Sequence, residues 1–436
     1  MKRVEALLNE GRYSEAFAEL AQGVDSPRPQ TAARAALGLA EFYGMYGPGE
    51  LENMEAALAE AEEILPAVRS DPLYRALTEL VRAYKGLPPQ SFATDDPRVA
   101  YHLARAELAF GRPERALELL SRFSDLPRYL KWQALELKGR ALEELGRYAE
   151  AADAYERAMF LAPPSDRPFL ALDVAAAATD AGDPERALAA LEAGGRPPDP
   201  KGEQDWLYAA ARAELALGNP EEALALLGRI EEPSVEVELE RGRALMDLGR
   251  HLEAEDAFRA ALEMAEGRRT DVLHELAIAL LEAGKYAEAE EILKDLVEDA
   301  EYGYRGTAAA DLAELYYRLA DLAQTEYWAK EALRLGDPAG ELFLGHVAYD
   351  RMRLEEALAH YRRVADRAPV GSREWLVAQQ TAVEILAQLG YPDPEEVLRR
   401  AEAALAHTPP ADEWAGALKH YAERARELRF KGRSLN

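Results

Sequence analysis

The stretch LELKGRALEELGRYAEAADAYERAMFLAP, residues 135–163, decides the fold of this chain. In its first half, apolar and small residues recur at spacings of three and four, which is the period of an amphipathic helix. Gly146 ends that helix, because glycine tolerates the left-handed conformation of a C-terminal cap. A second helix with the same period follows and stops at Pro163. The stretch predicts a helical hairpin whose two helices cross closely at Gly139 and Ala151, with Tyr148 and Tyr155 filling the core on either side.

The same pattern occurs eight times between Gly111 and Met352, at intervals of 31 to 36 residues. The turn residues are Gly111, Gly146, Gly182, Gly218, Gly249, Gly284, Ala320 and Met352. Seven positions before them stand the small residues Ala104, Gly139, Ala175, Ala211, Gly242, Ala277, Ala313 and Gly345. Five positions after them stand Ala116, Ala151, Ala187, Ala223, Ala254, Ala289, Thr325 and Ala357. A self-similar period of this length predicts a solenoid, in which each repeat packs on its neighbours.

These repeats resemble the tetratricopeptide repeat family. The resemblance is carried by Gly139, Gly146-Arg147-Tyr148, Ala151, Tyr155, Ala158 and Pro163, and almost as well by Gly242, Gly249, Ala254, Phe258 and Ala261. It implies an all-α, right-handed superhelical solenoid of about twelve helical hairpins. It also implies a concave groove that is lined by the first helix of each hairpin and binds an extended peptide or a partner helix.

The regularity of the pattern divides the chain into three expected regions. We expect irregular hairpins over residues 1–96, with an enlarged turn at 44–49 and loops at 86–89 and 94–97. The regular array is expected over 97–409. A capping helix and a basic tail are expected over 410–436, because the end of a solenoid has to cover its core. The cations of this tail interact favourably with the dipole of the last helix. Alternatively, they dock onto an acidic surface, such as that of a second copy of the chain, which would give a homo-oligomer.

Composition limits the classes of partner. The net charge of −28 argues against nucleic acid and anionic membranes, both of which need a basic surface. The lack of cysteine excludes disulfides and thiolate metal sites. The first residues, Met1-Lys2-Arg3-Val4-Glu5, include no apolar h-region, and no segment is apolar enough to span a membrane, so we expect an acidic, cytoplasmic protein. Arginine outnumbers lysine and asparagine is scarce, which is typical of a heat-adapted bacterium.

The groove-facing positions are those thirteen, ten, six and three residues before each turn residue. The position six before the turn holds Arg105, Arg140, Ala176, Arg212, Arg243, Ile278, Glu314 and His346. The same face carries Tyr101, Tyr208, His274, Tyr317 and Tyr349. Arginine with neighbouring tyrosine suits an acidic or carboxylate-bearing segment. The predicted partner-binding residues are therefore Arg105, Arg140, Arg212, Arg243, Tyr101, Tyr208, His274, Tyr317, His346 and Tyr349.

A competing interpretation is that these arginines neutralise the chain's own acids. Glu136 lies four residues before Arg140, and Asp205 and Glu236 share a face with Arg212 and Arg243. The carboxylate clamp known in the family requires lysine and asparagine at first-helix positions where this chain has few of either. We therefore do not expect a clamp of that type here.

No pattern of catalytic chemistry emerges. The seven histidines lack a His-Glu-x-x-His pair, and neither a phosphate-binding glycine loop nor a nucleophile elbow is present. We therefore expect no enzyme and no cofactor. The function predicted is that of a non-enzymatic scaffold that binds a protein or peptide in its groove. The alternative is a regulatory receptor that binds a small peptide or metabolite there.

Overall fold

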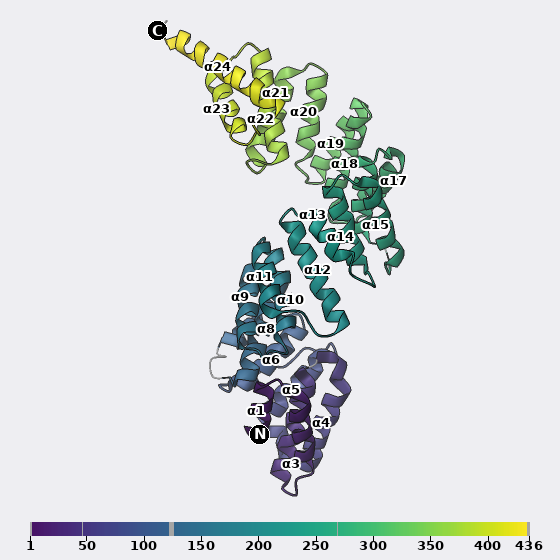
Figure 1. Cartoon of the computed structure of the whole chain (residues 1–436), viewed down its shortest axis with the longest axis vertical. Coiled ribbons are helices and arrows are strands. Elements are labelled where there is room, and N and C mark those ends of the chain that lie inside the picture. Colours follow the sequence, from purple (N-terminus) through teal and green to yellow (C-terminus); the bar gives the residue numbers. More distant parts are fainter. Residues whose placement is uncertain (1, 46, 122–125, 268, 434–436) are drawn as a thin grey trace. The chain divides into compact units, whose positions relative to one another are not determined.

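The computed structural model describes residues 2–45, 47–121, 126–267 and 269–433 (Figure 1). Over these ranges the chain forms α-helices and short 3₁₀ turns and no strand, which confirms the predicted all-α fold. Its contacts divide it into two units, Met1–Pro233 and Ser234–Asn436. The predicted region boundaries at 96/97 and 409/410 stay predictions.

Within the described residues, the first unit contains thirteen α-helices. They are α1 (Lys2–Asn9), α2 (Tyr13–Val24), α3 (Pro29–Met45), α4 (Leu51–Ile64), α5 (Pro72–Tyr84), α6 (Pro97–Ala109), α7 (Pro113–Leu119), α8 (Arg128–Glu144), α9 (Tyr148–Leu161), α10 (Arg167–Asp180), α11 (Pro184–Gly194), α12 (Pro200–Ala216) and α13 (Pro220–Leu227). The expected enlarged turn between α3 and α4 contains the 3₁₀ segment Gly47–Glu50. Helix α5 packs against α6 and follows a second 3₁₀ segment, Pro66–Ser70, where the repeat pattern is weakest.

The second unit continues the alternation of first and second helices. Its helices are α14 (Val235–Asp247), α15 (His251–Met264), α16 (Thr270–Glu282), α17 (Tyr286–Glu298), α18 (Arg305–Arg318), α19 (Leu322–Arg334), α20 (Gly340–Asp350), α21 (Leu354–Arg367), α22 (Arg373–Gln388), α23 (Pro394–Leu405) and α24 (Glu413–Arg433). Helix α24 packs on α22 and α23 and buries Leu418, Ala422 and Ala425.

Packing at the repeat positions follows from the sequence pattern. The eight residues that follow the turns by five positions are all fully buried, Thr325 among them. A β-carbon built at Gly139 would lie 2.5 Å from the ring of Tyr155, and one at Gly242 would lie 2.3 Å from the ring of Phe258. The helices of these hairpins therefore cross as closely as predicted. Tyr148 is an exception: it was predicted in the core, but it is 38% exposed because it starts the second helix at the edge of the hairpin.

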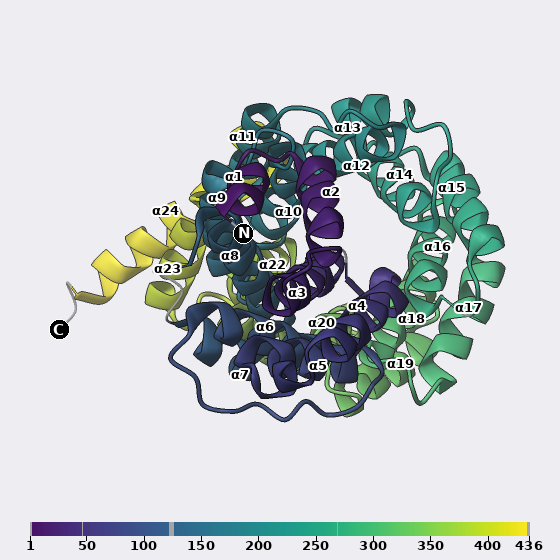
Figure 2. The same cartoon turned by 90° about the horizontal axis from the view of Figure 1, so that it is seen from below.

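The N-terminal hairpin folds back onto the middle of the first unit. Helix α1 packs against α8, and the Asn9 Oδ1 atom accepts the backbone N–H of Tyr129 at 2.8 Å. The Tyr13 hydroxyl donates to Asp166 Oδ2 at 2.9 Å, just before α10. In Figure 2, α1 and α2 lie beside α8 and α10. Segments that are 120 to 153 residues apart in sequence thus enclose part of the inner face of the first helices.

Candidate functional site

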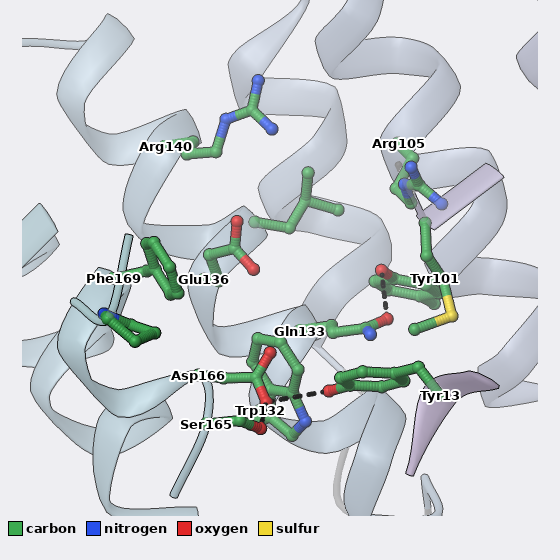
Figure 3. A pocket seen from close by; sticks show the side chains of 13 residues that line it. Tyr13, Tyr101, Arg105, Trp132, Gln133, Glu136, Arg140, Ser165, Asp166 and Phe169 are labelled. Carbon is green, nitrogen blue, oxygen red and sulfur yellow. Dashed lines mark hydrogen bonds between the residues drawn. The ribbon is translucent and has the colours of Figure 1, made fainter. Parts of the chain in front are cut away.

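A pocket of about 470 Å³, lined by both charged and apolar side chains, lies on the inner face of the first unit (Figure 3). Helix α8 forms its centre, α6 and α10 form two sides, and the N-terminal hairpin supplies a further wall. The residues that line it are Tyr13, Met45, Tyr101, Arg105, Trp132, Gln133, Glu136, Leu137, Arg140, Ser165, Asp166, Phe169 and Pro198. The pocket thus brings together three of the predicted binding residues, Tyr101, Arg105 and Arg140.

The helical period explains why α8 contributes so many of these side chains. Trp132, Gln133, Glu136, Leu137 and Arg140 stand at positions i, i+1, i+4, i+5 and i+8, so they share one face of the helix. Tyr101 and Arg105 are four residues apart on α6, and the same argument places both toward α8. The Tyr101 hydroxyl donates to Gln133 Oε1 at 3.1 Å, which joins these two helices at the pocket wall.

Arg105 is held in place by only part of its guanidinium. Its Nη2 group donates to the carbonyl of Gly44 and to the Tyr84 hydroxyl, the latter at 3.2 Å. Among the residues that the structure describes, the buried Nη1 group has no hydrogen-bond partner. A buried donor without a partner costs about 1–3 kcal/mol, so Arg105 leaves an unmet requirement for an acceptor beside the pocket.

Arg140 and Glu136 are the uncommitted charges of the pocket. Arg140 is exposed, and within the described ranges it makes neither a hydrogen bond nor an ion pair. Burial raises the pKa of the half-buried Glu136, while the charges of Arg140 and Arg105 oppose that rise. The internal pair between Glu136 and Arg140 that the sequence suggested is therefore not formed.

The opposite wall is organised around Asp166. Its Oδ2 atom accepts from the Tyr13 hydroxyl at 2.9 Å and from Ser165 Oγ at 2.8 Å. Trp132 lies next to it, and the indole Nε1–H of Trp132 is buried without a partner. Phe169, which is 45% exposed, adds an apolar surface at the rim. The pocket therefore combines donors, acceptors and aromatic faces.

Further acids lie along the same face, beyond the pocket. Burial, together with the charges of Glu136 and Glu143, raises the pKa of Asp173 on α10 to about 8. Burial also raises the pKa of Glu143, although the Tyr155 hydroxyl donates to this carboxylate at 2.6 Å. Near neutral pH, Asp173 is accordingly neutral in most molecules.

Two predicted arginines are paired within the chain. Arg212 on α12 forms an ion pair with Asp180 at 2.7 Å, and Arg243 on α14 forms ion pairs with Glu240 at 3.2 Å and Glu275 at 2.8 Å. The acids that the sequence suggested, Asp205 and Glu236, do not pair with them in the described chain. Asp180 and Glu275 belong to neighbouring repeats, whose positions periodicity within one helix could not reveal. Tyr208, one turn before Arg212, is half-buried on α12.

The other predicted residues lie in the second unit and are engaged in side-chain contacts. His274 is buried, with Nδ1 at 2.6 Å from the Tyr302 hydroxyl and Nε2 at 2.6 Å from Asp311 Oδ2. Tyr317 stacks on His346 with ring centres 5.1 Å apart, and both line a second pocket of about 430 Å³. Burial lowers the pKa of His346. The Tyr349 hydroxyl accepts from Gln388 Nε2 at 3.1 Å.

Several pocket residues were missed by the list of predicted binding residues. Gln133, Glu136 and Phe169 stand thirteen or ten positions before Gly146 or Gly182, so the groove-facing offsets already pointed to them. Tyr13 and Asp166 carry no such signal, because they reach the site only through the fold-back of the N-terminal hairpin.

Among the residues that the structure describes, no group of three or more His, Asp or Glu side chains could hold a metal ion. No helix in those ranges is long and apolar enough to cross a membrane.

Comparison with known proteins identifies the repeats. Two family models, both described as tetratricopeptide repeat, match the chain, one at residues 101–166 and 208–269 and the other at 245–302. These segments of the chain are tetratricopeptide repeats. Tetratricopeptide repeats typically bind other proteins or peptides, and the fold is that of a protein-interaction scaffold that is generally non-enzymatic.

Solved structures with tetratricopeptide repeats also align with the chain. A tetratricopeptide repeat protein from Parabacteroides merdae is 19% identical, with a TM-score of 0.47, and the alignment covers 58% of this chain and 98% of that one. The Cut9–Hcn1 hetero-tetramer of the APC/C gives 13% identity and a TM-score of 0.44, with 97% of this chain and 95% of that one covered. No curated protein matches the sequence.

Proposed function

We propose that this tetratricopeptide repeat protein is a non-enzymatic scaffold that binds a polypeptide partner on the inner face of its first helices. In the first unit, the pocket around Arg140 would bind an acidic side chain or a terminal carboxylate of that partner. The observation that carries the proposal is the guanidinium of Arg140, which lines the same pocket as Arg105 and makes neither a hydrogen bond nor an ion pair within the described ranges. Arginine binds carboxylates through two parallel hydrogen bonds, which gives both affinity and orientation.

The paired arginines have a smaller part in this proposal. Arg212 and Arg243 already neutralise Asp180 and Glu275, so a partner would have to displace an existing ion pair to use them. Exposed ion pairs contribute only about 0–1 kcal/mol, and exchange of partners at these sites therefore gains little free energy. The contribution to binding should decrease in the order Arg140, Arg105, then Arg212 and Arg243.

Affinity measurements on single variants test this order. The partner that co-purifies stoichiometrically from the native host would be titrated against Arg140→Ala, Arg212→Ala and Arg147→Ala. Loss of a charged hydrogen bond costs about 1.5–3 kcal/mol, so R140A should weaken binding roughly 10- to 100-fold. Arg147 is the matched control, because it is an exposed arginine on the same hairpin whose charge is paired with Glu150 at 2.7 Å. Unchanged affinity in R140A would refute the proposal.

One observation favours a second candidate, a receptor for a small peptide or metabolite. The fold-back of the N-terminal hairpin adds Tyr13 to the wall of the pocket, whose volume of about 470 Å³ lies in the range of small-ligand sites. A receptor would gain thermal stability from its ligand without any protein partner, whereas a scaffold would co-purify with a stoichiometric partner.

A further inference from the structure

The charges that face the first-unit pocket balance one another. Two guanidiniums, Arg105 and Arg140, and two carboxylates, Glu136 and Asp166, line the pocket. In Figure 3 the two arginines lie along one side, Asp166 lies on the opposite side, and the Glu136 carboxylate stands between them. A site of this kind has no net formal charge but a strong separation of charge, and it suits a ligand with a matching separation.

Glu136 and Arg140 do not neutralise each other, although their spacing allows it. Glu255–Arg259, Glu314–Arg318 and Glu396–Arg400 share the same order and spacing, and all three form ion pairs. No hydrogen bond or ion pair links Glu136 to Arg140 in the described part of the chain. The guanidinium of Arg140 and the carboxylate of Glu136 lie apart from each other in Figure 3. Each charge is therefore available to a ligand.

The position of Glu136 restricts what the arginines can bind. A simple anion on Arg140 would bring a second negative charge toward the half-buried Glu136 carboxylate, which receives no hydrogen bond from any residue within the described ranges. Like charges in such a setting repel, and the desolvated carboxylate would still lack a donor. A ligand that also carries an ammonium group removes both penalties, because the ammonium donates to Glu136 or Asp166.

We infer that the pocket binds a small zwitterion, a short free peptide whose carboxylate lies on Arg140 and Arg105 and whose ammonium group lies at Glu136 and Asp166. A tripeptide spans roughly 10 Å when extended, which suits a pocket of about 470 Å³. Trp132, Leu137 and Phe169 supply apolar surface for its side chains. The inference rests on the receptor candidate of the proposed function and gives its ligand a chemical class.

Capped peptides test the inference on the full chain. The tripeptides Ala-Leu-Ala and Ala-Phe-Ala would be titrated calorimetrically in three forms: free, N-acetylated and C-amidated. We expect at least one free peptide to bind and each cap to weaken binding at least 10-fold, because each removes one charge. If the acetylated and free forms bind equally while the amide is weaker, the zwitterion is refuted but the carboxylate site at Arg140 stands. If neither free peptide binds, the inference fails, and the R140A titration with a protein partner still decides the scaffold proposal separately.

A substitution at Glu136 gives a second, independent readout. Glu136→Gln keeps the shape of the side chain, so it should remove the preference for the free over the acetylated peptide and leave the preference for the carboxylate over the amide. Glu150→Gln, an exposed carboxylate on the same hairpin that is paired with Arg147, should change neither preference. An unaltered preference in E136Q would contradict the assignment of the ammonium group to this carboxylate. Should E136Q fail to fold, the capped peptides on the native chain still decide.

Discussion

At the scale of single residues, the turn between the two helices of each repeat imposes one backbone conformation. All eight turn residues have a positive φ, from 57° at Ala320 to 79° at Gly218. Glycine adopts this left-handed conformation freely, whereas a β-carbon is crowded there. Ala320 and Met352 hold it at 57° and 58°, so the repeat geometry prevails over their preference.

Replacing these two residues should stabilise the protein. We expect Ala320→Gly and Met352→Gly each to raise the free energy of unfolding by about 0.5–1 kcal/mol, since relief of strain exceeds the entropy gained by the unfolded chain. Met352 is 71% exposed, so little packing is lost with its side chain. Urea denaturation would measure the change, with Gly146→Ala as the reciprocal control that should lower stability. A loss of stability in both glycine variants would contradict the argument.

Asp173 should make stability depend on pH. Its pKa of about 8 in the folded chain lies above its ordinary value, so the folded state holds a proton that the unfolded state releases. The contribution of Asp173 to stability is then greatest below its unfolded pKa near 4 and falls as the pH rises toward 8. Asp173→Asn should remove this fall and stabilise the protein at pH 8 by at most a few kcal/mol, because the side chain is half-buried and partly screened. Denaturation midpoints of the native and D173N proteins at pH 5, 6.5 and 8 would measure this pH dependence. If the midpoint falls equally with pH in both proteins, Asp173 is not the cause.

At the scale of helical elements, the distance between paired helices is set by small residues. Gly139 and Gly242 face an aromatic ring at 2.5 and 2.3 Å from a built β-carbon, whereas the corresponding distance at Gly345 is 3.1 Å to Tyr361. The three hairpins thus share a pattern but differ in how closely their helices meet.

This difference predicts a graded response to alanine. Overpacking costs about 1–3 kcal/mol, while alanine in a helix gains about 1 kcal/mol over glycine. Gly139→Ala and Gly242→Ala should therefore destabilise the protein by about 1–2 kcal/mol, and Gly345→Ala should be nearly neutral. Thermal denaturation of the three variants side by side provides the measurement. Equal effects at all three positions would show that helix propensity and not ring contact governs them.

The sequence could predict these elements because their causes are local. A turn glycine, a small residue seven positions earlier and an alanine five positions later are sufficient to define a hairpin. Tyr148 was misplaced in the core because periodicity gives the face of a helix but not how far its first turn extends from the hairpin. The partners of Arg212 and Arg243 were missed for a related reason, since Asp180 and Glu275 lie on other repeats.

At the scale of the whole molecule, the chain is organised as two units joined at Pro233 and Ser234. Each has its own buried core, as expected of repeats that pack mainly on their sequence neighbours. The inner-face pocket with its uncommitted charges belongs entirely to the first unit. Its walls could be predicted only in part from the sequence, because the period identifies α6, α8 and α10 but not the fold-back of α1 and α2.

The two units should fold separately. We expect residues 1–233 and 234–436, expressed alone, each to give a helical circular dichroism spectrum and a cooperative unfolding transition. Loss of order should be limited to the hairpins next to the cut, which hydrogen exchange would locate. An unfolded half would show that the division is not a boundary of stability.

The fold-back of the N-terminal hairpin has a consequence for synthesis on the ribosome. Asn9 and Tyr13 contact Tyr129 and Asp166, which are translated 120 and 153 residues later. At about 5–20 residues per second, the first hairpin waits roughly 6 to 30 s for these partners. The intervening repeats can fold in the meantime because their contacts are local. The pocket around Arg140 is therefore among the last features of the first unit to form, and a nascent chain that stalls before residue 166 carries folded repeats without a ligand site.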